Sequence, residues 1–362
     1  MTKWEYTEQE LWRFNENGDA IFHVFGLVSV GATVLAFAEA RQGDGSDDQC
    51  PHDIRLRKSI DGGRTFAPDR TVISAEKVRC WANPVPVYDA EIGRLFLFYG
   101  ENIGGTHTGA YLIHSDDLGE TWSAPRDMES IFENAGLPAF RLAGPGHGIQ
   151  VKCGAAAGRL IVPVWYRGSS RYVSPAERGY CVSALYSDDH GATWHSTQTV
   201  GKATFSNESR IVETKAGLLW HMRTGKGVPT CISRSEDGGM TWSEPHTSGL
   251  SVVRNCDVGA ISLSAKGNYE DMVLLSRVGH ENKRMDMEIC ISLDGGETFT
   301  DTFKLMAGDC MPGYSDMCII GEEEPMLGLL HCRNNHVFFS RISLQTLTGG
   351  KYDNTSRTCW LQ

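Results

Sequence analysis

The octapeptide SDDLGETW, from Ser115 to Trp122, is the first indication of how this chain folds. Its pattern, S-x-D-x-G-x-T-[W/F], recurs as SIDGGRTF (59–66), SDDHGATW (187–194), SEDGGMTW (235–242) and SLDGGETF (292–299). The Asp can accept hydrogen bonds from nearby backbone N–H groups, and the Gly adopts conformations that other residues resist. The Thr continues into the next strand, and the aromatic ring is placed to pack between sheets. Each copy therefore predicts a structural hairpin turn rather than a calcium site.

Short alternating apolar runs precede these turns, and successive copies are spaced like propeller blades of roughly 40 to 50 residues with loop insertions. The repeats therefore predict an all-β protein, a six-bladed β-propeller. Three strands without an octapeptide, at 314–320, 326–332 and 337–344, supply the sixth blade. The run at 10–14 is expected to pair with them, so that the N-terminal strand closes the last blade and removes an exposed sheet edge. No Pro- or Ser-rich linker interrupts the chain, so we expect residues 1–362 to form a single domain.

The composition is that of an ordinary globular protein with a negative net charge. Hydrophobic residues make up 41% of the chain and charged residues 22%, with a formal net charge of -11. This excess of acid, without any basic run, disfavours nucleic acid and anionic membrane surfaces as partners. An anionic small ligand remains compatible, because a local group of Arg residues can reverse the field inside a pocket. The oligomeric state is left open.

The eleven cysteines are scattered singly, without CxxC pairs or spacings suited to zinc. We expect them to be mostly buried thiols in a reducing compartment. Residues 1–13 are polar, and no stretch is long enough to span a bilayer, so the sequence predicts a cytoplasmic protein. The twelve histidines are dispersed, and no Gly-rich phosphate loop is followed by Lys and Ser or Thr. Neither a metal nor another cofactor is therefore expected.

Four further stretches accompany the octapeptides: GLV (26–28) with LAFAEAR (35–41), WANPVPV (81–87), GPGHGIQ (144–150) and SNES (206–209). Together with the octapeptides, which match Asp boxes (BNR repeats), they resemble the exo-sialidase (neuraminidase) family and are similar to glycoside hydrolase family 33. The resemblance runs along almost the whole chain. It implies a sialidase-type propeller and a retaining exo-glycosidase that acts on sialylated or related acidic glycans.

The chemistry implied by this resemblance makes particular demands on side chains. Sialic acid carries a carboxylate on its anomeric carbon, which would repel a carboxylate nucleophile, so the family uses a Tyr hydroxyl. A Tyr has an ordinary pKa near 10, so a neighbouring Glu takes its proton. An Asp protonates the leaving oxygen and later activates water. Three Arg residues hold the substrate carboxylate through planar, charge-assisted bonds.

The resemblance assigns these roles to individual positions. Tyr314, in PGYSD (312–316), matches the nucleophile, and Glu208, in NES (207–209), matches its base. Asp47 matches the acid/base, with Asp48 close enough to be confused with it. Arg41 matches the supporting arginine of the family. Arg223 and Arg284 match the second and third arginines of the triad that binds the carboxylate.

One position departs from the family pattern. The first inner strand of the family opens with Arg-Ile-Pro, whereas this chain has His23-Val24-Phe25, so His23 replaces the first Arg of the triad. An imidazole is shorter, donates fewer hydrogen bonds and is only partly charged near neutral pH. Carboxylate binding could be weaker, the ligand could be another acidic sugar, or catalysis could be lost.

Two alternatives to a sialidase follow from that departure. One is a non-catalytic sugar-binding propeller, and the other is a glycoside hydrolase or lyase with altered glycan specificity, in which His23 contacts a hydroxyl instead of a carboxylate. His147 is a further candidate for contact with substrate, because it lies among three glycines that allow a close approach of the backbone. It could equally be a loop histidine that bonds to the backbone.

Overall fold

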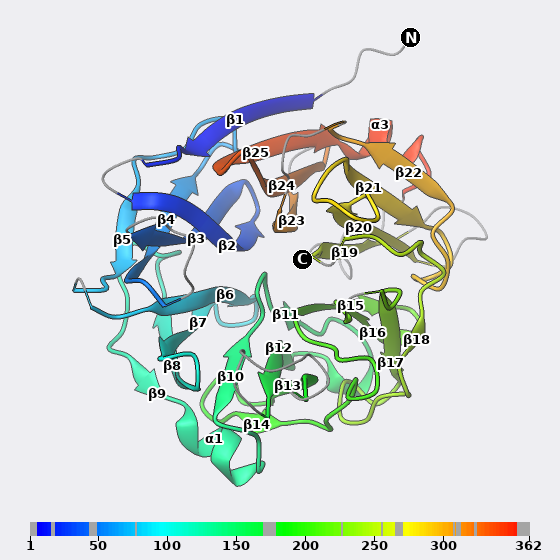
Figure 1. The fold of residues 1–362 in the computed structure, drawn as a ribbon. Coiled ribbons are helices and arrows are strands. Elements are labelled where there is room, and N and C mark those ends of the chain that lie inside the picture. Colours follow the sequence, from blue (N-terminus) through cyan, green and yellow to red (C-terminus); the bar gives the residue numbers. More distant parts are fainter. Residues whose placement is uncertain are drawn as a thin grey trace.

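The computed structural model describes residues 6–15, 19–42, 49–76, 78–168, 179–225, 227–254, 256–264, 271–306, 308, 313–321 and 324–352. These residues form six antiparallel sheets arranged around a central axis (Figure 1). The sheets are four-stranded, except for one that carries an additional short strand. The predicted all-β, six-bladed β-propeller is therefore confirmed.

In blades 1 to 5 the strands follow one another along the chain from the axis to the rim, so the first strand of each of these blades is innermost. Blade 1 comprises β2 (Asp19–Val30), β3 (Thr33–Gln42), β4 (His52–Ser59) and β5 (Arg70–Ile73). Blade 2 comprises β6 (Trp81–Asp89), β7 (Arg94–Ile103), β8 (His107–Ser115) and β9 (Arg126–Asp127). Blade 3 comprises β10 (Phe140–Ala143), β11 (Ile149–Gln150), β12 (Leu160–Arg167), β13 (Cys181–Ser187) and β14 (His195–Ser196).

The second half of the chain repeats this arrangement. Blade 4 comprises β15 (Ser209–Thr214), β16 (Gly217–Met222), β17 (Cys231–Ser235) and β18 (His246–Thr247). Blade 5 comprises β19 (Gly259–Leu263), β20 (Met272–Val278), β21 (Met287–Ser292) and β22 (Asp301–Lys304). Blade 6 comprises β23 (Ser315–Ile320), β24 (Met326–Arg333), β25 (His336–Ser343) and, paired with β25 from the other end of the chain, β1 (Tyr6–Trp12).

Within the part of the chain that the structure describes, helical structure is confined to short connections. They are α1 (Glu129–Asn134), the 3₁₀ turn η2 (Gly154–Ala156) and α3 (Leu344–Thr348). Among the described residues, none of the helices has the length and apolar character needed to cross a membrane.

The Asp boxes form the turns between the third and fourth strands of blades 1 to 5. In the box of blade 2, Asp117 accepts hydrogen bonds from the backbone N–H and the hydroxyl of Thr121, at 2.9 and 2.6 Å. The hydroxyl of Ser115 donates to Asp117 at 2.7 Å and accepts from the N–H of Gly119 at 2.7 Å. The box is therefore closed by its own side chains, as its sequence predicts.

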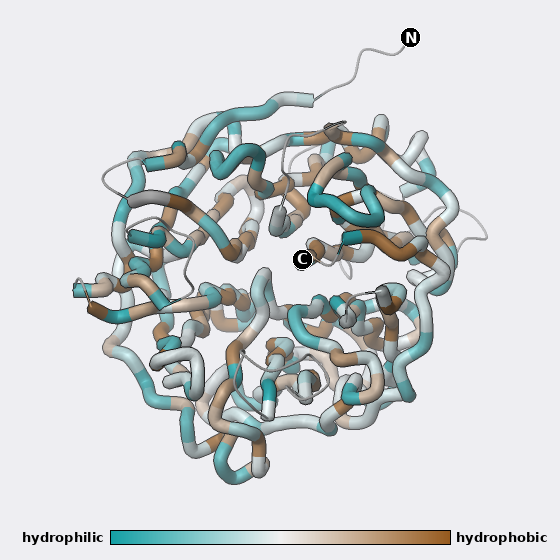
Figure 2. Tube along the Cα trace, viewed as in Figure 1, coloured by the Kyte–Doolittle hydropathy of each residue, from teal (hydrophilic) through white to brown (hydrophobic). Residues whose placement is uncertain are grey.

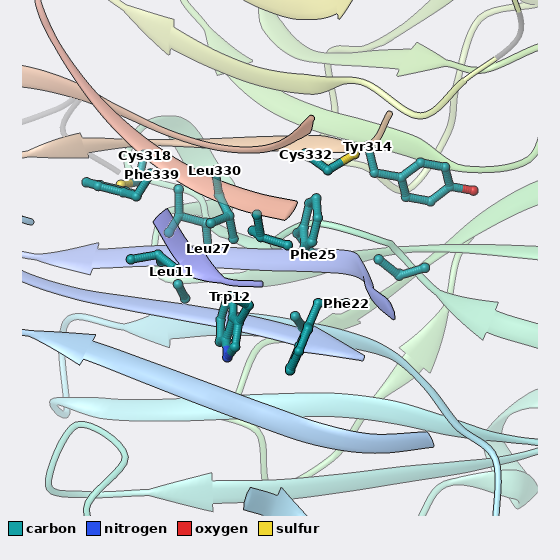
Figure 3. Packing of buried hydrophobic residues seen from close by; sticks show 14 of the residues in the cluster. Leu11, Trp12, Phe22, Phe25, Leu27, Tyr314, Cys318, Leu330, Cys332 and Phe339 are labelled. Atoms are coloured by element: carbon teal, nitrogen blue, oxygen red, sulfur yellow. The ribbon is translucent and has the colours of Figure 1, made fainter. Parts of the chain in front are cut away.

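Apolar side chains fill the space between neighbouring sheets. In Figure 2 the hydrophobic stretches, drawn in brown, lie along strands within the blades. Where blade 6 meets blade 1, Trp12 of β1 stacks on Phe22 of β2, with ring centroids 5.5 Å apart and planes inclined by 17°. Figure 3 shows these two rings side by side, with Tyr314 at the far edge of the same cluster and its hydroxyl directed away from it.

The inner strands determine where functional side chains meet. The residues that follow β2 and β23 lie together, because the N–H of Gly321 donates to the carbonyl of Gly31 at 3.0 Å. These two strands therefore run in the same direction along the axis, as expected when every blade begins at its inner strand. Residues at the starts of different inner strands then converge on one end of the propeller.

Candidate functional site

Tyr314 and Glu208 meet at that end of the axis. Each lies directly before an inner strand, Glu208 before β15 and Tyr314 before β23, and each is at most 8% exposed. The Tyr314 hydroxyl donates a hydrogen bond to Glu208 Oε1. The structure thus brings the predicted nucleophile and the predicted base into direct contact across 106 residues of sequence.

Arg223 completes this group. It follows β16, where its backbone N–H donates to the carbonyl of Glu208 at 3.0 Å, so the hairpin between β15 and β16 sets the two side chains next to each other. Its guanidinium pairs with Glu208 Oε2 and lies 3.0 Å from the Tyr314 hydroxyl oxygen. One cation therefore contacts both members of the Tyr–Glu pair.

Burial and charge shift the pKa of Tyr314. Loss of water raises the pKa well above its usual value of 10, and the neighbouring Glu208 carboxylate raises it further. The positive charge of Arg223 acts in the opposite direction without reversing the shift. The phenol is consequently protonated near neutral pH, and it needs a base to become a nucleophile.

His23 packs against the other side of Tyr314. Its ring centroid lies 4.5 Å from that of Tyr314, with planes inclined by 47°. A β-bulge separates His23 from Phe25, and Val24 in the bulge has a φ of 50°. Such a bulge re-aims the side chains of its strand. His23 is partly exposed and makes no hydrogen bond to another described residue.

The surroundings of His23 are strongly positive. Burial lowers its pKa well below 6.5, and the charges of Arg41, Arg284 and Arg223 lower it further. The imidazole is therefore neutral near pH 7. Arg284 places its guanidinium carbon 5.8 Å from the centre of the Tyr314 ring. Three of the predicted arginines thus surround one uncharged histidine.

Arg41 differs from the other two arginines in being paired within its own strand. Its Nη2 and Nε atoms donate to Glu39 Oε2 at 2.8 and 3.0 Å. The other oxygen of Glu39 accepts the backbone N–H of Asn83 at 2.8 Å, which ties blade 1 to blade 2. Much of the charge of Arg41 is therefore balanced before any ligand arrives, which fits a supporting role.

The remaining predicted residues are not part of this cluster. Asp47 and Asp48 lie outside the described residues, shortly after Arg41. His147 is buried, and its Nδ1 lies 3.0 Å from Asp316 Oδ1. It also lines a cavity of about 260 Å³ whose other walls include residues 27–31 and 317–319, at the opposite ends of β2 and β23. Contact between His147 and a substrate stays a prediction.

Sequence reasoning missed a set of charged residues beneath the Tyr–Glu pair: Arg210, Asp257 and Asp316 are all at most 1% exposed. A signal was present, since Arg210 and Asp316 lie two residues after Glu208 and Tyr314. Side chains two residues apart on a strand point to the same face. Which of these charged side chains pair with each other depends on how the blades are arranged, and the spacing along the sequence does not reveal it.

This arrangement can support attack by a phenol on an electrophilic carbon. Glu208 is placed to accept the phenolic proton, Arg223 supplies positive charge next to the attacking oxygen, and Arg284 adds a second positive charge near the Tyr314 ring. Among the described residues, no group of three or more His, Cys, Asp or Glu side chains is placed to hold a metal ion.

The comparisons with known proteins agree with the fold. The family model for the BNR repeat-like domain matches residues 32–332. A sialidase of Bacteroides fragilis (strain YCH46) is 26% identical over 92% of this chain and 64% of its own length. A sialidase of Micromonospora viridifaciens is also 26% identical, over 95% of this chain and 55% of its own length. The chain thus spans less than two thirds of each of these curated relatives.

A solved structure shows the same architecture. The intramolecular trans-sialidase from Ruminococcus gnavus, in complex with oseltamivir carboxylate, matches with a TM-score of 0.77 at 20% identity, over 93% of this chain and 98% of that chain. At this identity the likeness shows the fold alone. Because the family model covers most of the chain and the six blades agree with it, the protein belongs to the sialidase family of BNR-repeat β-propellers.

Proposed function

We propose that this protein is a retaining exo-glycosidase that releases a terminal sialic acid, or a related nonulosonic or ulosonic acid, through a tyrosine nucleophile. The observation that carries the proposal is the hydrogen bond from the Tyr314 hydroxyl to Glu208, with Arg223 3.0 Å from the same hydroxyl. A phenol bonded to a carboxylate in a buried, positively charged site is suited to attack a carbon that itself bears a carboxylate.

In the first step, Tyr314 Oη forms a bond to the anomeric carbon while its proton passes to Glu208. The glycosidic bond breaks, and its electron pair goes to the aglycone oxygen, which is protonated by Asp47 in the role that the family resemblance gives it. The raised pKa of Tyr314 means that proton transfer accompanies attack and does not precede it. The product of this step is a covalent glycosyl-tyrosine.

In the second step, a water oxygen bonds to the anomeric carbon as Asp47 takes its proton. The bond to Tyr314 Oη breaks, and Glu208 returns the proton to the phenolate. Two inversions give net retention of configuration. Arg223 and Arg284 hold the substrate carboxylate during both steps, because guanidinium groups donate paired, charge-assisted bonds to carboxylates.

His23 favours a second candidate, a glycoside hydrolase or lyase with altered glycan specificity, in which His23 contacts a hydroxyl instead of a carboxylate. The neutral imidazole can donate one hydrogen bond and accept another, whereas the arginine of the family pattern only donates. His23 is partly exposed beside the Tyr314 ring and has no hydrogen-bond partner among the described residues. A hydroxyl of the substrate could therefore hydrogen-bond to His23 at the position where the first arginine of the family pattern would bind the substrate carboxylate.

Time-resolved NMR with three substrates tests both candidates: an α-sialoside, and α-glycosides of the eight-carbon ulosonic acid and of the deaminated nine-carbon sugar. We expect one sugar to appear first as its α anomer. Tyr314→Phe should slow its release by roughly 10³-fold or more, because the nucleophile is lost. Tyr99→Phe, a buried tyrosine in the core of blade 2, is the matched control and should retain the wild-type rate.

Two outcomes would overturn the proposal. Appearance of the β anomer first would show inversion and exclude a covalent tyrosine intermediate. Broadening of ligand signals without release would identify a non-catalytic sugar-binding propeller. Release from the eight-carbon or deaminated sugar in preference to the sialoside would identify the related acid that the proposal includes, whereas a wild type that neither binds nor releases any of the three sugars would favour the second candidate.

A further inference from the structure

A buried ionic layer lies directly below the Tyr314–Glu208 pair. Arg210 on β15 and Asp316 on β23 each follow a member of that pair by two residues. Since side chains alternate along a strand, Arg210 points to the same face of its strand as Glu208. In the same way, Asp316 points to the same face as Tyr314. The two inner strands therefore carry two stacked pairs, with the ionic pair one layer deeper along the axis.

Asp316 joins three other blades to the strand of Tyr314. Its Oδ2 accepts the backbone N–H of Leu27 in blade 1 at 2.8 Å. Its Oδ1 lies 3.0 Å from His147 Nδ1 in blade 3 and 3.5 Å from Arg210 Nε in blade 4. Because the carboxylate is 0% exposed, water does not compete for these contacts.

Arg210 makes a matching set of contacts from the strand of Glu208. Its Nη2 lies 2.7 Å from Asp257 Oδ2, next to β19 of blade 5, and its Nη1 donates to the carbonyl of Pro145 in blade 3. A Cβ atom at Gly146 would lie only 2.2 Å from the Arg210 guanidinium. The absence of a side chain at Gly146 is therefore what allows the guanidinium to pass.

The charges in this layer are costly to bury. Replacing a buried ion pair by apolar residues of similar volume is often neutral or stabilising, so stability alone does not account for such a pair. What a network of this kind does provide is a fixed geometry between the strands that carry it. Here those are the strands that carry the nucleophile and its base.

We propose that the Arg210–Asp316 pair, together with Asp257 and His147, positions the Tyr314 hydroxyl against Glu208 for proton transfer. This inference rests on the proposed function of the same site. Arg210, Asp257 and Asp316 are positioning residues, since they are at most 1% exposed and reach the substrate only through Tyr314 and Glu208. Loss of the layer lets β15 and β23 shift relative to each other, and a misplacement of about 1 Å at a reacting group can lower the rate by roughly 100-fold.

Two conservative variants test this role. Asp316→Asn keeps an oxygen for the Leu27 N–H but removes the charge that faces Arg210, and Arg210→Lys keeps the charge but loses the forked geometry. We expect each to lower kcat by about 10- to 100-fold and to change KM by less than about threefold, because the substrate contacts are not altered. Arg210→Lys is the milder change and is available if Asp316→Asn does not fold.

Glu213→Gln is the matched control. Glu213 lies on the same strand as Arg210, is 4% exposed, and also joins two blades by accepting the N–H groups of Lys152 and Cys153 at 2.7 and 2.8 Å. It is five residues from Glu208, which is about 16 Å along a strand. Its replacement should destabilise the fold while leaving kcat unchanged.

A second readout does not depend on turnover. In protein labelled with ¹³Cζ-tyrosine, the Tyr314 signal is identified by its absence from Tyr314→Phe. We expect this signal to move in Asp316→Asn and Arg210→Lys and to stay in place in Glu213→Gln.

The outcomes separate the two proposals. If the wild type releases none of the three sugars, the proposed function fails, and the ¹³Cζ signal alone decides whether the layer positions Tyr314. If the folded variants keep kcat within about twofold of wild type, or if the Tyr314 signal does not move, the positioning role is rejected.

Discussion

The side chain at position 23 sets the number of positive charges that face the Tyr314 ring. His23 is neutral near pH 7, because burial and the charges of Arg41, Arg284 and Arg223 all lower its pKa. Titration of His23 in the free protein therefore cannot make carboxylate binding fall between pH 6 and 8. A pH dependence in that range would mean that the ligand itself raises the pKa of His23.

We predict that His23→Arg lowers KM for an α-sialoside by about tenfold or more, because a charge-assisted hydrogen bond to the carboxylate is gained. Without ligand the same variant should be less stable than wild type, since it adds a cation beside three others. KM is measured by steady-state release and stability by thermal unfolding. His23→Gln, polar but uncharged, is the control and should not lower KM. An unchanged or higher KM in His23→Arg would favour the altered-glycan candidate.

His221, on β16, gives a prediction for the pH dependence of stability. Burial lowers its pKa to about 3, with smaller contributions from Arg277 and Arg210. The unfolded chain takes up a proton near pH 6.5, whereas the folded protein does not until about pH 3. The folded state is therefore destabilised progressively as the pH falls below 6.5.

Replacement of His221 by Leu should remove this penalty. Urea unfolding of the wild type and of His221→Leu at pH 7.5 and 5.5 measures it. The difference in the free energy of unfolding, variant minus wild type, should rise by about 1.4 kcal/mol at the lower pH. A difference that does not change with pH would contradict the neutral state of His221 in the folded protein.

At the scale of the elements, the Asp-box turns also join neighbouring blades. A Cβ atom added at Gly191, in the box of blade 3, would lie 2.3 Å from the Phe96 ring of blade 2. The equivalent glycine of blade 5, Gly296, faces Leu219 of blade 4 at 2.2 Å. The box glycine therefore provides both a positive φ and the space into which the preceding blade packs.

We predict that Gly191→Ala lowers the free energy of unfolding by roughly 2 to 4 kcal/mol, the sum of backbone strain at positive φ and overpacking. Gly249→Ala isolates the first of these costs, since Gly249 has a φ of 70° but no atom within 4 Å of the added Cβ. Gly249→Ala should lower the free energy of unfolding by about 1 kcal/mol. Equal losses in the two variants, measured in urea, would show that contact with the neighbouring blade contributes nothing.

At the scale of the whole molecule, the ring is closed by pairing between the two ends of the described chain. β1 pairs with β25 in blade 6, while Trp12 reaches into blade 1. There it stacks on Phe22 and donates its indole N–H to Asp69 at 2.8 Å. Trp12 is 0% exposed, so one large buried side chain contributes directly to the contact between the first and last blades.

Truncation of Trp12 should therefore weaken the junction between blades 6 and 1. Trp12→Ala is expected to lower the free energy of unfolding by about 3 to 5 kcal/mol, as for other large core aromatics. Phe14→Ala, at a nearby side chain that is 48% exposed, should change it by less than about 0.5 kcal/mol. Similar losses for both variants in chemical denaturation would show that Trp12 has no special place in closure.

Local chemistry made much of the fold predictable. The Ser, Asp, Gly and Thr of an Asp box bond to one another within a few residues, so the sequence of each box contains all of its partners. The strands expected at 314–320, 326–332 and 337–344 coincide closely with β23, β24 and β25 for the same reason, since strand alternation is also local.

The candidate site was predictable only in part. The resemblance to sialidases pointed to Tyr314, Glu208 and Arg223, and the structure places these three in contact. It could not show that His23 is neutral, because its pKa depends on arginines brought near it by other strands and blades.

The repeat, the turn that follows the third strand of blades 1 to 5 and the residue types available to the site therefore follow from the sequence alone. The pairing of Arg210 with Asp316 beneath Tyr314, across 106 residues of sequence, arises only in the folded protein. The reason is the distance along the chain over which each interaction acts. Turn and strand preferences arise between neighbours in sequence, whereas burial, charge pairing and pKa depend on which distant strands share the axis of the propeller.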